Sequence, residues 1–190
     1  MPILGIVASA ISGNLVTNSY ESIATVTVGS GGSTSVDFTS IPSTYTHLQI
    51  RCLARGNSAG TGTDALQIRF NSDTGSNYAS HLIMGNGASA LVDVATSSSY
   101  MYLKEMICRG GNLASTFSGI VVDILDYKST NKNKTVRAFG GHDRNGAGAI
   151  IFQSGLWFAT PAAITSINLT GENNFAQYTQ FALYGIKESA

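Results

Sequence analysis

Hydrophobic and polar residues alternate along this chain from about residue 19 onward. In the segment HLQIRCLAR, for example, Leu48, Ile50 and Cys52 alternate with polar neighbours. A period of two places successive side chains on opposite faces of a strand and therefore predicts β-structure. Turn residues, chiefly Gly, Ser and Asn, interrupt the pattern. The predicted strands lie within residues 24–28, 36–38, 48–52, 64–71, 78–84, 99–108, 115–127, 134–139, 148–158, 163–170 and 178–186.

So many short strands, with no long helical pattern between them, predict an all-β fold. The best match is an antiparallel β-sandwich of the jelly-roll type. Its eight core strands would pack as two sheets, while the other strands extend an edge or cross between the sheets. A propeller or solenoid would need an internal repeat, and the sequence contains none. We therefore expect one jelly-roll domain over residues 20–190, preceded by an extended N-terminal arm over residues 1–19.

The N-terminal segment MPILGIVASAISGNL is apolar and contains Pro2 and Gly5, which oppose a helix. An apolar run that ends in small residues imitates a secretory signal, but no Lys or Arg precedes it, and it is too short to span a bilayer. The alternative is an extended arm that buries its apolar side chains on another protein. The residues expected to dock are Ile3, Leu4, Ile6, Val7 and Ile11.

Two of the predicted strands, within 115–127 and 178–186, carry apolar residues on both faces. One face of each strand serves the core. The other must meet an arm, a loop or another subunit, because a monomer seldom leaves such a surface in water. The pattern therefore predicts a homo-oligomer. Candidate interface residues are Phe117, Val121, Leu125, Tyr184 and Ile186.

The composition narrows the choice of partners and cofactors. The chain is 43% hydrophobic, which is too high for a disordered protein, and its formal net charge is zero. That balance gives no electrostatic preference for nucleic acid or for an anionic membrane. Cys52 and Cys108 are too few for a disulfide framework or a metal site, so we expect buried free thiols. No cofactor, nucleic-acid partner or membrane partner is predicted.

Residues that would support catalysis are few. Among the three histidines only His142 has an acid beside it. Asp123 and Asp126 could flank a glycosidic bond. Residues three apart on a strand point to opposite faces, however, unless the strand ends or bulges between them. The sequence therefore predicts a protein that is not an enzyme, although catalytic groups could still converge from distant strands.

The loop NSDTGSNY is the best candidate for a specific contact, because Asn71, Asp73 and Asn77 place oxygen atoms around Gly75. Calcium favours such ligands, but only one carboxylate is present and the EF-hand spacing is absent. The structural interpretation is that Asn71 and Asp73 form Asx turns while Gly75 takes a positive φ. Both interpretations stay open at this point.

A second candidate contact is KSTNKNK, residues 128–134, which concentrates Lys128, Lys132 and Lys134 between two predicted strands. Such a segment is typical of a solvated hairpin tip. The functional alternative is contact with an anionic polysaccharide of the host surface or with an acidic capsid surface.

Several aromatic residues near turns could stack on sugar rings. Trp157 lies within the apolar run LWF, so burial is the stronger expectation for it, with its N–H bonded to a backbone carbonyl. The other residues of this group are Tyr20, Tyr45, Tyr78 and Phe175.

Four segments together resemble a family of small jelly-roll virion proteins of tailed bacteriophages, especially phages of aquatic bacteria. They are RFNSDTGSNYASH at 69–81, YTQFALYGIK at 178–187, the opening MPILGIVASAISGNL, and SYESIATVTVGSGGS at 19–33. The resemblance runs nearly end to end. It implies a virion protein, assembled in the cytoplasm of the bacterial host, that is either a capsid decoration or a tail fibre or baseplate component.

The resemblance also implies that the oligomer is a trimer whose N-terminal arm attaches it to other virion proteins. In the tail variant the exposed loops would touch a host surface glycan or protein. The rival hypothesis is a carbohydrate-binding, lectin-like protein or a polysaccharide-degrading phage protein. An enzyme of that kind would need a cleft with converging carboxylates.

Overall fold

A computed structural model describes residues 19–187, which form twelve strands and no helix. The docking residues predicted in the arm lie outside this range. The prediction of an all-β antiparallel sandwich is confirmed. The strands are β1 (Tyr20–Thr27), β2 (Ser33–Phe38), β3 (His47–Ala54), β4 (Thr63–Phe70), β5 (Tyr78–Gly85), β6 (Ala90–Ser98), β7 (Met101–Cys108), β8 (Ser118–Ile124), β9 (Lys134–Asp143), β10 (Gly148–Trp157), β11 (Ile167–Phe175) and β12 (Gln180–Ile186).

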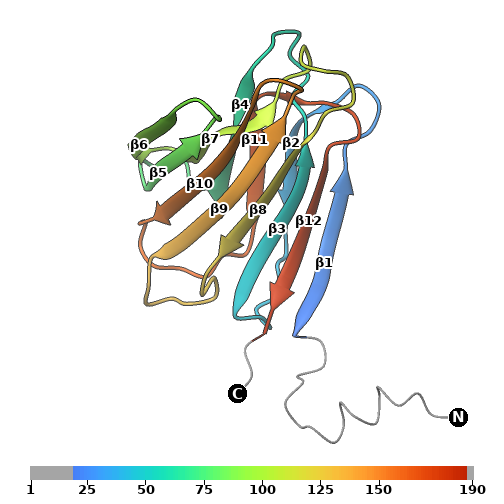
Figure 1. The fold of residues 1–190 in the computed structure, drawn as a ribbon. Coiled ribbons are helices and arrows are strands. Elements are labelled where there is room, and N and C mark those ends of the chain that lie inside the picture. The colour runs from blue at the N-terminus through green and yellow to red at the C-terminus, as the bar shows by residue number, and fades with distance from the viewer. Residues whose placement is uncertain (1–18, 188–190) are drawn as a thin grey trace, which may run out of the picture.

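The connections between the strands are those of a jelly roll. One sheet has eight strands in the order β1-β12-β3-β8-β9-β10-β5-β6, and the other has four in the order β2-β11-β4-β7. Four antiparallel pairs are nested along the chain, namely β1 with β12, β2 with β11, β3 with β8 and β4 with β7. Successive pairs fall in alternate sheets, so the chain winds around the sandwich as a jelly roll does (Figure 1).

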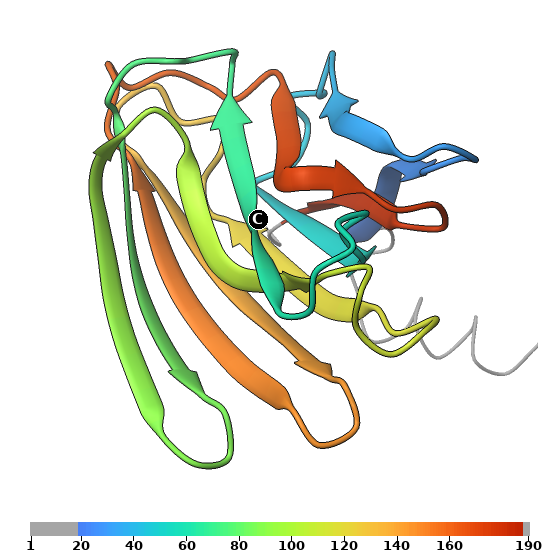
Figure 2. The ribbon, with the colours of Figure 1, turned by 90° about the horizontal axis from the view of Figure 1, so that it is seen from above.

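Two hairpins, β5-β6 and β9-β10, extend the larger sheet beyond this jelly-roll core. Each is inserted between two core strands: β9 pairs with β8, and β5 pairs with β10. Figure 2 shows them projecting side by side, away from the part of the sandwich that the smaller sheet covers. The expectation that extra strands extend a sheet edge is therefore confirmed.

The β6 strand is the one element that the alternation did not predict. It forms the free edge of the eight-stranded sheet, and its side chains are mostly exposed on both faces. Leu91 and Val92 are adjacent apolar residues, and both are exposed. Because neither face is buried, nothing selects for a strict apolar and polar alternation along this strand.

The core lies between the two sheets and is built from the inward-facing residues of both. Cys52 and Cys108 are buried free thiols, as predicted. Trp157 is also buried, but its indole N–H donates to the carboxylate of Asp73 at 2.7 Å and not to a backbone carbonyl. The largest fully buried side chains are Tyr78, Tyr127, Phe70, Lys134, Phe175, Phe181, Leu48, Ile50, Leu66, Ile68, Met101 and Leu103.

Candidate functional site

The outer face of the eight-stranded sheet, which points away from the smaller sheet, carries an unusual number of apolar side chains. The register places Val121 opposite Phe139, Phe139 opposite Phe152, and Phe152 opposite Ile83. Ile83 in turn faces Val92 on the edge strand. A row of apolar residues therefore crosses five neighbouring strands on the side of the sheet that the second sheet does not cover.

We define the apolar patch as six exposed residues of this face on β5, β6, β9 and β10. Their exposed fractions range from 48% for Phe139 to 75% for Val92. The rings of Phe139 and Phe152 contact each other, with centroids 4.8 Å apart. The members of the patch are Ile83, Val92, Val94, Phe139, Ile150 and Phe152.

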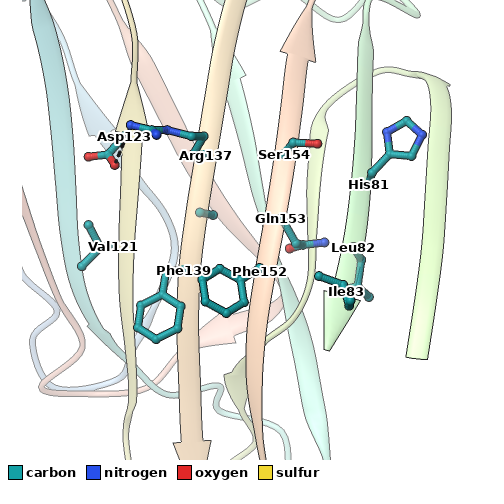
Figure 3. Close-up of a pocket in the computed structure, with 11 residues that line it drawn as sticks. His81, Leu82, Ile83, Val121, Asp123, Arg137, Phe139, Phe152, Gln153 and Ser154 are labelled. Carbon is teal, nitrogen blue, oxygen red and sulfur yellow. Dashed lines mark ion pairs between the residues drawn. The ribbon is translucent and has the colours of Figure 1, made fainter. Parts of the chain in front are cut away.

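Beside the patch lies a hollow of about 570 Å³, which Figure 3 shows from outside the sheet. One side of this first hollow is apolar and includes Phe139 and Phe152. The other side follows the next row of the register, where Asp123 faces Arg137, Arg137 faces Ser154, and Ser154 faces His81. Asp123 and Arg137 form an ion pair with an N···O distance of 3.8 Å. The face thus combines an apolar row with a parallel polar row.

The five predicted interface residues do not form one surface. Val121 lines the first hollow, and Tyr184 lies on the same outer face two strands away, on β12. Phe117 lines a separate hollow beside residues 85–87 and 146–150. Leu125 lies in the turn after β8, and Ile186 pairs with Tyr20 at the end of the sheet.

Sequence reasoning missed the rest of the patch, although one signal pointed to it. The segment AIIFQSGLWF of β10 has apolar residues at both even and odd positions, so one set had to lie on the outer face. The two inserted hairpins decide which strands lie beside β10. This strand order is a long-range property that no local sequence pattern contains.

The NSDTGSNY loop is held by its own hydrogen bonds. The Asp73 carboxylate accepts hydrogen bonds from the Gly75 amide at 2.8 Å, the Asn77 side chain at 2.9 Å and the Trp157 indole at 2.7 Å. The Asx turn expected at Asp73 is therefore present. The positive φ predicted for Gly75 is wrong: Asn71 and Ser72 take positive φ values of 51° and 57° instead.

Asn71 links this loop to a distant segment instead of closing an Asx turn. Its side-chain oxygen accepts from the Thr165 amide at 2.8 Å, and its side-chain nitrogen donates to the Ala163 carbonyl at 2.7 Å. Positive φ suits an asparagine well, because its short side chain tolerates the left-handed conformation. The hydrogen bonds of this loop therefore use polar side-chain atoms of Asn71, Asp73 and Asn77 to hold the fold itself.

Replacing Asp73 with alanine should lower the free energy of unfolding by about 2–3 kcal/mol, because the buried Trp157 N–H loses its acceptor. Burial raises the pKa of the Asp73 carboxyl, but the hydrogen bonds from Trp157, Asn77 and the Gly75 amide outweigh it and hold the pKa below 3.8. A carboxyl whose pKa falls on folding stabilises the protein above its unfolded pKa, and this contribution is lost as the pH falls.

The measurement is urea unfolding of the wild type and of Asp73→Ala at neutral pH and below pH 3.8. The gap between the two proteins should narrow in acid. Asp37→Ala serves as the control, since Asp37 is an exposed residue of β2. An equal gap at both pH values would contradict a stabilising carboxylate at residue 73.

The three lysines of the 128–134 turn lie in different environments. Lys128 is exposed, and Lys132 is exposed and paired with Asp126 at 2.7 Å. Lys134, in contrast, is fully buried, and its ammonium donates to the carbonyls of Ser129 and Lys132. Burial lowers the pKa of Lys134. The prediction that Lys134 contributes to an exposed contact is therefore wrong, and the residue instead braces the turn.

Asp123 and Asp126 do not converge. Asp123 lies on β8 and faces Arg137, whereas β8 ends at Ile124 and Asp126 pairs with Lys132 in the turn that follows. Among residues 19–187 no group of three or more His, Cys, Asp or Glu side chains could hold a metal ion. The same part of the chain contains no helix that is long and apolar enough to cross a bilayer.

The outer face of the larger sheet is therefore the candidate functional site, with its apolar patch, its polar row and its hollows. Comparisons with protein-family models, curated proteins and solved structures found no significant match to this chain.

Proposed function

We propose that this chain is a non-enzymatic structural protein of a bacteriophage particle. In this proposal the sandwich forms a homo-oligomer, with three copies expected, through the apolar patch on its larger sheet. The N-terminal arm then attaches the oligomer to another virion protein. The exposed apolar patch is the observation that most supports the proposal, and the sequence resemblance supplies the virion setting.

The patch supports self-association because of its size and position. Six large apolar side chains lie together on one sheet face, and two of them are aromatic rings in contact. Contiguous exposed surfaces of this kind usually mark a protein interface. The neighbouring edge strand β6 also presents unpaired backbone groups and exposed apolar side chains, which invite further pairing. A closed ring of subunits would cover both features.

The same assembly fits a capsid decoration and a tail component equally. A decoration would use the oligomer to bridge neighbouring capsid proteins, while a tail or baseplate component would present the distal loops to the host. Neither role needs a catalytic cleft. Asp123 and Asp126 do not converge, and this favours the two virion roles over the polysaccharide-degrading alternative.

Deletion of residues 2–15 tests the arm. We expect the truncated chain to unfold at the same temperature as the full chain and to keep its oligomeric mass, because the described residues 19–187 form a hydrophobic core between the two sheets. Incorporation into particles of the phage that encodes the chain should fail. The measurements are light scattering after gel filtration, circular dichroism melting and immunodetection in purified particles. Normal incorporation without residues 2–15, or loss of folding, would refute the role of the arm.

A further inference from the structure

We propose that a second hollow on the outer face, over β12, β3 and β8, is a binding site for a neutral oligosaccharide. This inference rests on the proposed function only for its setting, in which the particle meets a host surface. It names the ligand class and places the site on the jelly-roll core, on the far side of Phe139 from most of the apolar patch. Its evidence is the shape, the aromatic wall and the hydrogen-bonding groups of this hollow.

The second hollow has a volume of about 500 Å³, which is within the range of small-ligand pockets. Its lowest part lies where two small residues, Gly119 and Ala182, reduce the height of the sheet surface. No atom lies within 4 Å of the position that a Cβ of Gly119 would occupy. Around these residues it is lined by Arg51, Leu53, Val121, Phe139, Gln180 and Tyr184.

One wall of the hollow is the ring of Tyr184, which its neighbours hold in place. The rings of Tyr20 and Tyr184 stack with centroids 4.9 Å apart and an interplanar angle of 22°. The guanidinium of Arg51 lies over both rings, 5.3 Å and 5.6 Å from their centroids. Rings fixed in this way lose little conformational freedom when a flat ligand packs on them. The C–H face of a pyranose is such a ligand surface.

Hydrogen bonds also fix the polar groups beside this wall. Gln49 accepts from the Tyr20 hydroxyl at 2.7 Å and from Arg51 Nε at 3.0 Å, and its amide donates to Asp123 at 2.8 Å. The hydrogen bond from Arg51 to Gln49 uses Nε and neither terminal nitrogen, and the Arg51 side chain is exposed. The guanidinium of Arg51 is therefore held in place at the hollow, with the Gln49 amide and the Asp123 carboxylate fixed on the sheet face beside it.

The mixture of donors and acceptors favours sugar hydroxyls over other ligands. A hydroxyl both donates and accepts, so it can accept from the guanidinium of Arg51 and donate to the amide oxygen of Gln180, two side chains that line the hollow. The positive charge of Arg51, which would favour a phosphate or a carboxylate, is partly offset by the nearby Asp123, because Gln49 accepts from Arg51 and donates to Asp123. A peptide strand usually adds to a sheet edge, and nucleic acid needs a basic track, whereas this site crosses the middle of a sheet face.

The apolar part of the hollow completes the match. Leu53 and Phe139 stand opposite the tyrosine wall and offer contacts to the C–H groups of a second sugar unit. Because Val121 and Phe139 line both hollows, the second hollow opens towards the first along the sheet. An open-ended site with one polar and one apolar side suits an oligosaccharide chain better than a single free sugar.

Gly119→Val tests the site with little risk to the fold. Valine favours strands, Gly119 lies on β8 outside the positive-φ residues, and the new side chain would fill the hollow without a clash. The matched control is Gly85→Val on β5, another glycine of the outer face with no atom within 4 Å of its Cβ position. Tyr184→Ala removes the aromatic wall as a second variant. Circular dichroism melting of each variant checks the fold.

The probe is a microarray of neutral bacterial O-antigen and capsule oligosaccharides with sulfated and phosphorylated chains beside them, followed by titration calorimetry with the strongest neutral binder. We expect neutral chains to bind the wild type and Gly85→Val. Gly119→Val and Tyr184→Ala should weaken that binding by about tenfold or more. Absence of neutral binders, binding of polyanions alone, or unchanged binding by Gly119→Val would overturn the inference.

Light scattering on the same samples separates this inference from the proposed function. Glycan binding by a monomeric wild type would support the site and contradict the proposed oligomer. A wild-type trimer that binds no neutral glycan would support the proposed oligomer and refute the proposed binding site.

Discussion

Replacing Arg55 with methionine is expected to lower the free energy of unfolding by about 3–4 kcal/mol. Arg55 follows β3 and is 9% exposed, and its guanidinium donates to four backbone carbonyls in the segment between β7 and β8. The acceptors and distances are Gly110 at 2.7 Å, Asn112 at 3.2 Å, Leu113 at 2.9 Å and Thr116 at 2.6 Å. Methionine keeps the unbranched stem but leaves all four carbonyls without this donor.

The geometry of arginine explains why this effect should be large. A planar guanidinium carries five N–H groups in a fixed arrangement, so one side chain can close a whole loop around itself. We therefore expect Arg55→Lys to recover only part of the stability, since an ammonium has three donors at one point. Arg137→Met is the control, because that side chain is 65% exposed and should change stability by less than about 0.5 kcal/mol.

Chemical unfolding measures the loss, and hydrogen exchange locates it. The amides of residues 109–117 should exchange faster in Arg55→Met, while those of β9 and β10 keep their protection because their pairing is independent of this loop. A variant as stable as the wild type would show that the carbonyls find other donors and that Arg55 is not the organising residue of the loop.

The strands of the jelly roll could be predicted because burial of one sheet face imposes alternation. The period-two pattern located eleven of the twelve strands, and Ile120, Val122 and Ile124 lie on the core face as their spacing indicates. The missing strand, β6, has no buried face and so has no such pattern. The Arg55 cluster was also invisible, because its acceptors are backbone carbonyls, which any residue type supplies.

The candidate site was only partly predictable for a related reason. Val121 and Tyr184 were identified because their strands have apolar residues on both faces. The patch, which lies next to Val121, depends on the order β8-β9-β10-β5-β6, which brings Ile83 next to Phe152 across a long sequence separation. Lys134 illustrates the converse error. A charged residue within a polar segment suggested exposure, but the turn folds over the side chain and satisfies it with two carbonyls.

Two functions can share the outer face because, apart from Phe139 on β9, they use different strands. The patch occupies the inserted hairpins β5-β6 and β9-β10, whereas the second hollow lies over β12, β3 and β8 of the jelly-roll core. Subunits that met through the hairpins would leave the tyrosine wall at the border of the interface. Phe139 belongs to both regions, so a substitution at Phe152, which does not line the second hollow, separates them more cleanly.

Phe152→Lys should weaken self-association by about 100-fold to 1,000-fold, equivalent to about 3–4 kcal/mol. Phe152 lies at the centre of the patch, where it contacts Phe139 and faces Ile83 across the strands. Inside an interface the lysine would bury an unpaired charge in place of an aromatic ring. The monomer should stay folded, because Phe152 is 55% exposed and points away from the core.

Leu113→Lys is the matched control, since Leu113 is also 55% exposed but lies in the loop after β7, away from the outer face. Sedimentation equilibrium over a range of concentrations should give a trimer for the wild type and for Leu113→Lys, and monomers for Phe152→Lys. Equal association of all three proteins would place the interface elsewhere. In that case the free edge of β6 would be the next surface to test, because a lysine at residue 152 leaves the unpaired backbone groups of that strand intact.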